Sequence, residues 1–169
     1  MKIANMKLQF FGLFLILFAG ITFAQTGKAS KNISIVTEKG RSLSLTSAQL
    51  AKMPRIEITA KDHDGAEAVF SGIELKTILS SAGAKFGKEL RGPEIGQYVI
   101  VEAADGYRAV YSLTDLDQDF ADKVVILADS KAGKPLDPKN GPWQVIATNE
   151  KKHARWVRQV IRLKVMKAK

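Results

Sequence analysis

The chain of 169 residues contains no cysteine and only two histidines. Without cysteine there can be no disulfide bond, no nucleophilic thiolate and no metal site built on thiolate ligands. Asp62, His63 and Asp64 could hold a metal ion together with His153, but catalytic zinc sites typically use three protein ligands. Asp-His-Asp-Gly is also an ordinary turn sequence, in which aspartate side chains accept from nearby backbone amides. We therefore expect no metal site here.

Other signatures of chemistry are also missing from the sequence. We find no nucleophile elbow, in which a serine sits in a sharp strand-to-helix turn, and no glycine-rich loop that would surround a phosphate. There is no internal repeat, no low-complexity segment and no linker that would divide the chain. The chain therefore forms a single domain. Any binding or catalytic site in it must combine residues that are far apart in the sequence.

Residues 1–24 have the composition of a secretory signal peptide. Lys2 and Lys7 precede the apolar run Phe10–Ile21, and the small residues Thr22 and Ala24 fit a cleavage site after Ala24. The run is shorter than the ~20 residues that span a bilayer, although an uncleaved anchor helix is the alternative. No arginine pair precedes it, so we expect general export in an unfolded state. The sequence thus predicts a periplasmic or secreted protein with no stable membrane insertion after cleavage.

The chain is strongly basic, with 26 lysines and arginines against 17 acidic residues and a formal net charge of +9. In a nuclear or cytosolic protein this surplus would suggest a nucleic-acid partner. In an exported protein it favours a small anionic ligand or an acidic partner in the cell envelope. We therefore predict these partners and no nucleic acid.

The pattern of the remaining chain predicts an α+β domain built on a mostly antiparallel β-sheet with one or two short helices. After a flexible lead-in at 25–31, the domain occupies residues 32–169. One short helix follows the N-cap residue Thr46, and a second begins at Gly72–Leu75 and ends at Gly83. The strands are predicted from alternation and turn residues at Ile33–Thr37, Ser42–Leu45, Arg55–Lys61, Ala66–Phe70, Tyr98–Ala104, Tyr107–Leu113 and Val124–Ala128.

The segment Arg155–Val165 carries three arginines beside Trp156 and fits two periodicities. Its valines and isoleucine favour a strand over a helix. In that strand Arg158, Arg162 and Lys164 would share one face, which predicts a cationic sheet face that attracts anions. The alternative is a solvated edge strand whose charges keep the protein soluble. We expect Trp156, like Trp143, to be a core or rim residue.

Four segments of the chain carry a family resemblance. They are LSLTSAQLAKMP, FSGIELKTILSSAG, VIVEAADGYRAVYSL and the stretch Val125–Val165, which includes GKPLDPKNGP and ARWVRQVIRLKV. In this order they resemble the molybdopterin-binding domain of the sulfite oxidase family of oxidoreductases. The resemblance implies that fold, with molybdopterin as the cofactor of its typical members. It also implies that Arg155 and Arg158 occupy positions that contact the cofactor's phosphate, with Lys152 and His153 beside them.

The chain departs from that family at the metal ligand. A cysteine thiolate binds molybdenum in the family, and the matching position falls at Lys61–Asp64, where His63 stands. Neither a carboxylate nor an imidazole replaces a soft thiolate in kind. Family members that leave the cell with their cofactor inserted also use a twin-arginine signal, which this chain lacks. His63 is therefore a candidate ligand contact at this position, without an assigned metal.

The hairpin around Asp105-Gly106 offers a further candidate contact. Arg108 could face a ligand, or the hairpin could be purely structural, with Asp105 forming the turn and Tyr107 and Tyr111 packing. The candidate binding residues of the whole chain are Arg155, Arg158, Lys152, His153, His63 and Arg108.

Three functions follow for the protein. The first is an atypical or non-catalytic member of the fold that binds an anionic ligand or partner through its basic C-terminal face. The second is a molybdopterin-dependent oxidoreductase with non-thiolate metal ligation. The third is an envelope protein that binds acidic polymers. The sequence does not identify the cofactor, if any, and leaves the three functions open.

Overall fold

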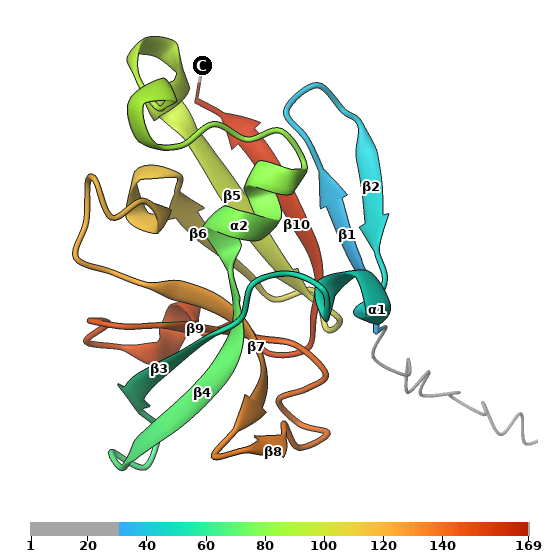
Figure 1. Cartoon of the computed structure of the whole chain (residues 1–169), viewed down its shortest axis with the longest axis vertical. Coiled ribbons are helices and arrows are strands. Elements are labelled where there is room, and N and C mark those ends of the chain that lie inside the picture. Colours follow the sequence, from blue (N-terminus) through green and yellow to red (C-terminus); the bar gives the residue numbers. More distant parts are fainter. Residues whose placement is uncertain (1–30, 169) are drawn as a thin grey trace, which may run out of the picture.

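The computed structural model describes residues 31–168, which form two sheets with short helices between and beside them (Figure 1). The first sheet contains, in spatial order, β2 (Ser42–Leu45), β1 (Ile33–Val36), β10 (Val160–Lys167), β5 (Gln97–Ala103) and β6 (Arg108–Ser112). The second sheet contains β3 (Ile56–Lys61), β4 (Glu67–Glu74), β7 (Val125–Lys131) and β8 (Lys134–Pro135), with β9 (Gln144–Ala147) paired to β7. The predicted signal peptide, and the lead-in up to residue 30, lie outside the described residues.

Two α-helices and four 3-10 helices connect the strands. They are α1 (Ser47–Leu50), α2 (Leu75–Ser81), η1 (Gly87–Glu89), η2 (Gly92–Gly96), η3 (Thr114–Leu116) and η4 (His153–Arg155). Helix α1 starts at the predicted cap, where the Thr46 hydroxyl accepts from the Gln49 amide at 3.3 Å and the Gln49 side chain accepts from the Thr46 amide. Gly83 ends the α2 segment in the left-handed conformation that its sequence position predicts.

The last strand of the chain occupies the middle of the first sheet. Strand β10 pairs in parallel with β1 and antiparallel with β5, while every other pairing in the two sheets is antiparallel. In β5, alternate residues are buried, which places Val99 and Val101 in the core. Leu163 and Val165 of β10 join them there. The mostly antiparallel α+β fold expected from the sequence is confirmed.

The second sheet contributes two strands with continuous apolar burial. The first four residues of β7 and all four of β9 are buried, as expected for strands that are covered on both faces. Helix α2 lies against β4 and β7, and its buried residues Leu75, Ile78 and Leu79 fill the space beside them. Both tryptophans are buried, which confirms that Trp143 and Trp156 are core residues.

Two sequence predictions of element boundaries were wrong. The residues Gly72–Glu74 continue β4 instead of opening the helix, because they pair with Ile126–Ala128 of β7. The predicted strand Arg155–Val165 begins only at Val160. Before it, Arg155 ends η4 and Gln159 adopts a positive φ of 47°. Long-range backbone bonds, such as that from the Val160 amide to the Trp143 carbonyl, override the local β-propensity there.

This shorter strand removes the predicted cationic sheet face. Arg162 and Lys164 are exposed on β10, but Trp156 is buried and Arg158 lies in the loop before the strand. A bulge between Val160 and Arg162 also shifts the register. Among the residues that the structure describes, no helix combines the length and apolarity needed to cross a membrane.

Gly72 offers a direct test of the packing between β4 and β7. A Cβ atom at this position would lie 2.2 Å from the Leu127 carbonyl oxygen and 2.7 Å from Ala128 Cα. We expect Gly72→Ala to lower the free energy of unfolding by about 3 kcal/mol in urea denaturation, because backbone atoms cannot yield as a side chain would. At Gly96 a Cβ would meet only Ala168, at 3.8 Å. The control Gly96→Ala should therefore change stability by less than about 0.5 kcal/mol, and equal effects would contradict the packing argument.

Candidate functional site

Three loops meet at one end of the first sheet and form a hollow of about 240 Å³. They are the β3–β4 turn, the β5–β6 turn and the segment from η4 to the start of β10. We call this the histidine–arginine site. Its lining residues come from all three loops and are His63, Ala103, Asp105, Tyr107, His153, Ala154, Trp156 and Arg158. Three of the candidate binding residues, His63, His153 and Arg158, are thus brought together by the fold.

The β3–β4 turn holds His63 in place through its flanking aspartates. The Asp62 carboxylate accepts from the His63 amide at 2.7 Å, and the Asp64 carboxylate accepts from the Ala66 amide at 2.9 Å. Gly65 has a φ of +83°, which the turn requires. Asp62 also forms an ion pair with Lys131 of β7. The aspartates therefore perform the turn chemistry expected from their sequence, and the exposed imidazole of His63 remains available.

Two tyrosine hydroxyls fix the short helix η4. Tyr107 donates to the Ala154 carbonyl at 2.5 Å, and Tyr111 donates to the Arg155 carbonyl at 2.7 Å. Tyr111 is fully buried, and burial raises its pKa. Tyr107 is 49% exposed and lines the site instead of packing in the core, unlike the sequence-based alternative that had both tyrosines pack. These bonds set the position of the neighbouring His153.

The aromatic rings form a continuous stack from the core to the surface. Phe70 meets Trp156 edge-on at 5.7 Å between ring centroids, and Trp156 contacts His153 at 4.1 Å. His153 in turn contacts His63 edge-on at 4.7 Å. The two histidines, ninety positions apart, are therefore neighbours that rest on a buried tryptophan. Within residues 31–168 neither imidazole makes a hydrogen bond, so their nitrogens are free for a ligand.

Positive charge gathers at the exposed end of this stack. Partial desolvation lowers the pKa of His63, and the charges of Arg158 and His153 lower it further, while Asp62 acts in the opposite direction. Desolvation and these neighbouring groups thus keep His63 neutral to a lower pH than usual. An anion bound among them would offset this repulsion and favour the protonated imidazole.

Arg155 and Arg158 have different roles, although their sequence positions suggest the same one. Arg155 bonds to Asp115 at 3.0 Å and to Glu150, and its guanidinium lies 4.4 Å from the Tyr111 ring centroid. Burial acts to lower the pKa of Arg155, but hydrogen bonds to Glu150 and Asp115 outweigh it and raise the pKa. Its charge is compensated inside the protein, so Arg155 holds η4 and is not free for a ligand.

Arg158, by contrast, makes no ion pair or hydrogen bond with its side chain within residues 31–168. It is half-buried at the wall of the hollow. Asp105 is the acidic residue that lines the same hollow, and its carboxylate accepts from the Tyr107 amide at 2.9 Å. A half-buried guanidinium without a carboxylate partner needs either water or an anion.

The remaining two candidates lie outside the hollow. Arg108 is exposed on β6 and donates to the Glu102 carboxylate at 2.8 Å. This hydrogen bond from Arg108, with the charge of Arg162, lowers the pKa of Glu102. Lys152 is exposed next to His153 and does not line the hollow. The structure therefore brings together three of the six candidates and places Arg155, Arg108 and Lys152 around or away from them.

One buried donor at the floor of the site lacks a partner. Trp156 Nε1 is the buried side-chain polar atom for which no acceptor is found among the described residues. Leaving a buried N–H unpaired costs about 1–3 kcal/mol, so such groups are rare in folded proteins and concentrate at functional places. The sequence predicted a buried tryptophan but gave no signal that its nitrogen would be unpaired.

The side chains at this site do not fit molybdenum. The β3–β4 turn presents the imidazole of His63 to the hollow, and the whole chain has no cysteine. Among the described residues no cluster of three histidine, aspartate, glutamate or cysteine side chains could hold a metal ion. The donors present are cationic or neutral nitrogen groups, which suit anionic oxygen atoms and not a soft metal.

The comparisons with known proteins support the fold alone. No family model and no curated protein matches the chain. Among solved structures it is similar to the sulfane dehydrogenase SoxCD from Paracoccus pantotrophus, with a TM-score of 0.63 and 19% sequence identity. The match covers 82% of this chain and 39% of that chain, so the protein spans less than half of its structural neighbour. The likeness agrees with a distant fold relationship to the sulfite oxidase family.

The charge of Arg158 can be tested through the titration of His63. We expect Arg158→Gln to raise the pKa of His63 in an NMR pH titration of the imidazole signals, because a nearby positive charge is removed. The control Arg162→Gln should leave this pKa unchanged, since Arg162 pairs with Glu102 on the sheet face. An unchanged His63 pKa in Arg158→Gln would mean that the two groups are not coupled.

Proposed function

We propose that this protein is an exported, non-catalytic or atypical member of the sulfite oxidase fold that binds a small oxyanion at the histidine–arginine site. The ligand would be a phosphate, a sulfate or the anionic group of a larger molecule. The observation that carries the proposal is Arg158, which is half-buried and unpaired within the described chain beside two imidazoles. A guanidinium and an imidazolium are both strong donors to oxyanions.

The surroundings favour a defined pocket over a diffuse basic surface. His153 is held between Trp156 and His63, and η4 is fixed by the tyrosine hydroxyls, so the donors are positioned before a ligand arrives. Arg155, Arg108 and Arg162 are each paired with a carboxylate, so of these four arginines Arg158 alone has no carboxylate partner within residues 31–168. A preorganised donor set loses little conformational entropy on binding.

A second candidate function is a molybdopterin-dependent oxidoreductase with non-thiolate ligation. The observation in its favour is the contact between the His63 and His153 rings. The sequence resemblance implies that His63 stands near the family's thiolate position. Against it stands the donor set described above, which suits anions better than a soft metal. Metal analysis of protein purified from its native compartment separates the two functions. Stoichiometric molybdenum would overturn the proposal of a non-catalytic anion-binding protein. A stable protein without metal would overturn the oxidoreductase.

Anion binding should depend on Arg158 and not on net charge. We expect Arg158→Gln to weaken the binding of inorganic phosphate by about tenfold in calorimetric titration, since a charge-assisted hydrogen bond is lost. The control Arg162→Gln removes the same charge at a residue paired with Glu102. It should change the affinity by less than about twofold at physiological salt.

If both variants lost phosphate affinity equally, and the affinity depended only on salt concentration, the pocket proposal would be wrong. The result would favour a diffuse basic surface that binds acidic polymers.

Binding should also strengthen as the pH falls. Sulfate keeps its charge across the neutral and mildly acidic range, so only the protein changes. Because the pKa of His63 lies below its usual value, its positive charge appears at a lower pH than that of an ordinary histidine. We expect sulfate affinity to rise as the pH drops through this pKa, measured by calorimetry, and the rise to shrink in His63→Gln. Affinity independent of pH in the unmodified protein would exclude His63 as a contact.

Export is part of the proposal and has its own test. We expect mass spectrometry of the protein from the periplasm or medium to show a mature chain that starts at Gln25. Ala24→Phe places a bulky side chain at the cleavage position and should leave residues 1–24 attached. The matched change Gln25→Ala, just after the cut, should be processed normally. A full-length chain in the cytoplasm would contradict the proposed location.

A further inference from the structure

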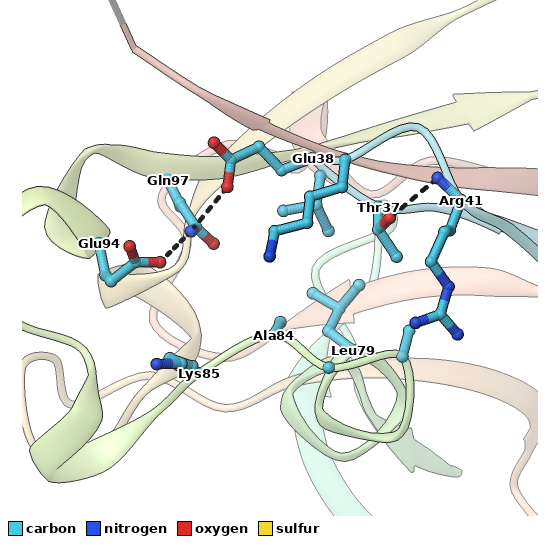
Figure 2. Close-up of a pocket in the computed structure, with 12 residues that line it drawn as sticks. Thr37, Glu38, Arg41, Leu79, Ala84, Lys85, Glu94 and Gln97 are labelled. Atoms are coloured by element: carbon cyan, nitrogen blue, oxygen red, sulfur yellow. Dashed lines mark hydrogen bonds between the residues drawn. The ribbon is translucent and has the colours of Figure 1, made fainter.

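A second hollow, of about 290 Å³, lies at the other end of strand β5 from the histidine–arginine site. Figure 2 shows it in close-up. Strand β5 runs from Gln97 at this hollow to Ala103 at the histidine–arginine site, so the two are separated by about 20 Å. We call it the Gln97 hollow. It is formed by the β1–β2 turn, the end of α2, the η2–β5 junction and β10. Its lining residues are Thr37, Glu38, Lys39, Arg41, Leu79, Ala82, Gly83, Ala84, Lys85, Glu94, Gln97 and Val165.

One side of the Gln97 hollow is apolar. Leu79 of α2 and Val165 of β10 are buried core residues that reach its lining, and Ala82 and Ala84 are half-buried beside them. Figure 2 shows Leu79 and Ala84 on the side opposite Glu38. An apolar group of a ligand would be removed from water here, which stabilises the complex by about 25 cal/mol per Å² of apolar surface.

The opposite wall carries excess negative charge. Gln97 is buried, and its amide nitrogen donates to Glu38 at 3.3 Å and also to Glu94. Two carboxylates from different segments thus share one uncharged donor. Lys167 compensates Glu94 at 3.4 Å, whereas Glu38 forms no ion pair within residues 31–168. A ligand ammonium would supply both the missing positive charge and the additional donors.

The rim of the hollow carries positive charge. Lys39 and Arg41 of the β1–β2 turn make no ion pair with any other residue in the described part of the chain. Figure 2 shows Arg41 at one side of the hollow and the Glu94 and Gln97 pair at the other. A guanidinium can hold both oxygens of one carboxylate. The hollow therefore has two carboxylates on one wall, two cations without ion pairs at its rim and an apolar side. Lys85 also lines it, on the side of Glu94, and pairs with Glu89 at 4.0 Å (Figure 2).

The frame that carries these groups is rigid. The turn is closed by bonds from the Thr37 amide to the Arg41 carbonyl at 2.8 Å and from the Arg41 amide to the Thr37 hydroxyl at 3.1 Å. Behind α2, the fully buried Asp117 accepts from Lys76 at 2.7 Å and from the Gly87 amide at 2.5 Å. Although desolvation opposes it, these hydrogen bonds lower the pKa of Asp117. They fix both ends of the segment that lines the floor.

From this arrangement we propose that the Gln97 hollow binds a small zwitterion with an apolar side chain, such as a free amino acid. The ammonium lies against Glu38 and Glu94, the carboxylate against Arg41 and Lys39, and the side chain on the apolar floor. The volume is at the lower end of the range for small-molecule sites, which fits a ligand of amino-acid size. This site shares no residue with the histidine–arginine site and does not depend on the function proposed there.

The test uses L-leucine and nitrogen–proton NMR correlation spectra of the mature protein. We expect the Gln97 side-chain amide signals to shift with a dissociation constant of about 1 mM or below. Isocaproate, which lacks the amine, and isoamylamine, which lacks the carboxylate, should each bind about tenfold more weakly, because one charged wall is left without its partner. Sulfate should not compete with L-leucine, since it belongs to the other end of the sheet.

Variants separate the two charged walls. Glu38→Gln keeps an acceptor for Gln97 but removes the charge, and Arg41→Gln removes the guanidinium; each should weaken L-leucine binding by about tenfold. The matched controls Glu57→Gln and Arg91→Gln change exposed residues outside the hollow and should have no effect. The proposal is overturned if L-leucine leaves the Gln97 signals unshifted at about 20 mM. It is also overturned if isocaproate binds the unmodified protein as tightly as L-leucine does. The same holds if both wall variants bind L-leucine as tightly as the unmodified protein does.

Discussion

The pairing of β10 in the middle of the first sheet is the constraint on which the rest of the structure depends. This last strand of the chain joins the β1–β2 hairpin on one side to the β5–β6 hairpin on the other. Two-stranded hairpins are marginally stable alone, so the sheet forms only when the C-terminal segment is in place. The same pairing positions both hollows, because β10 begins beside Arg158 at one end and brings Val165 to the Gln97 hollow at the other.

The distribution of charge partners separates supporting residues from binding residues. Arg155 is close in sequence to Arg158, yet it is held by Glu150 and Asp115 and by two tyrosines that fix its helix. A cation with carboxylates around it contributes to the fold, and because those carboxylates compensate its charge it attracts a ligand anion only weakly. Arg158 has no such partner within residues 31–168, so its interaction energy is available for an anion. In a chain of net charge +9, position and pairing matter more than the number of basic residues.

The relation to the structural neighbour is one of fold, and the chemistry of the site is the chain's own. At 19% identity the arrangement of strands is similar, and this chain contains no cysteine. The groups that meet at the histidine–arginine site are two imidazoles and the guanidinium of Arg158, and these donors suit anions better than a soft metal. Similarity of fold therefore does not by itself imply the same chemistry, which depends on the residues at the site.

The sequence by itself determined the helix cap at Thr46 and the β5–β6 turn, because caps and turns depend on residues only a few positions apart. The pattern of these elements along the chain also indicated the α+β class. It also identified Arg158 and the two histidines as candidates. Only the tertiary structure decided that β10 starts at Val160 and that His63 contacts His153 across ninety positions. It alone decided which arginine is compensated, since the partners of Arg155 come from separate loops. Contacts of this kind depend on which segments the folded sheets bring together, and no local pattern encodes them.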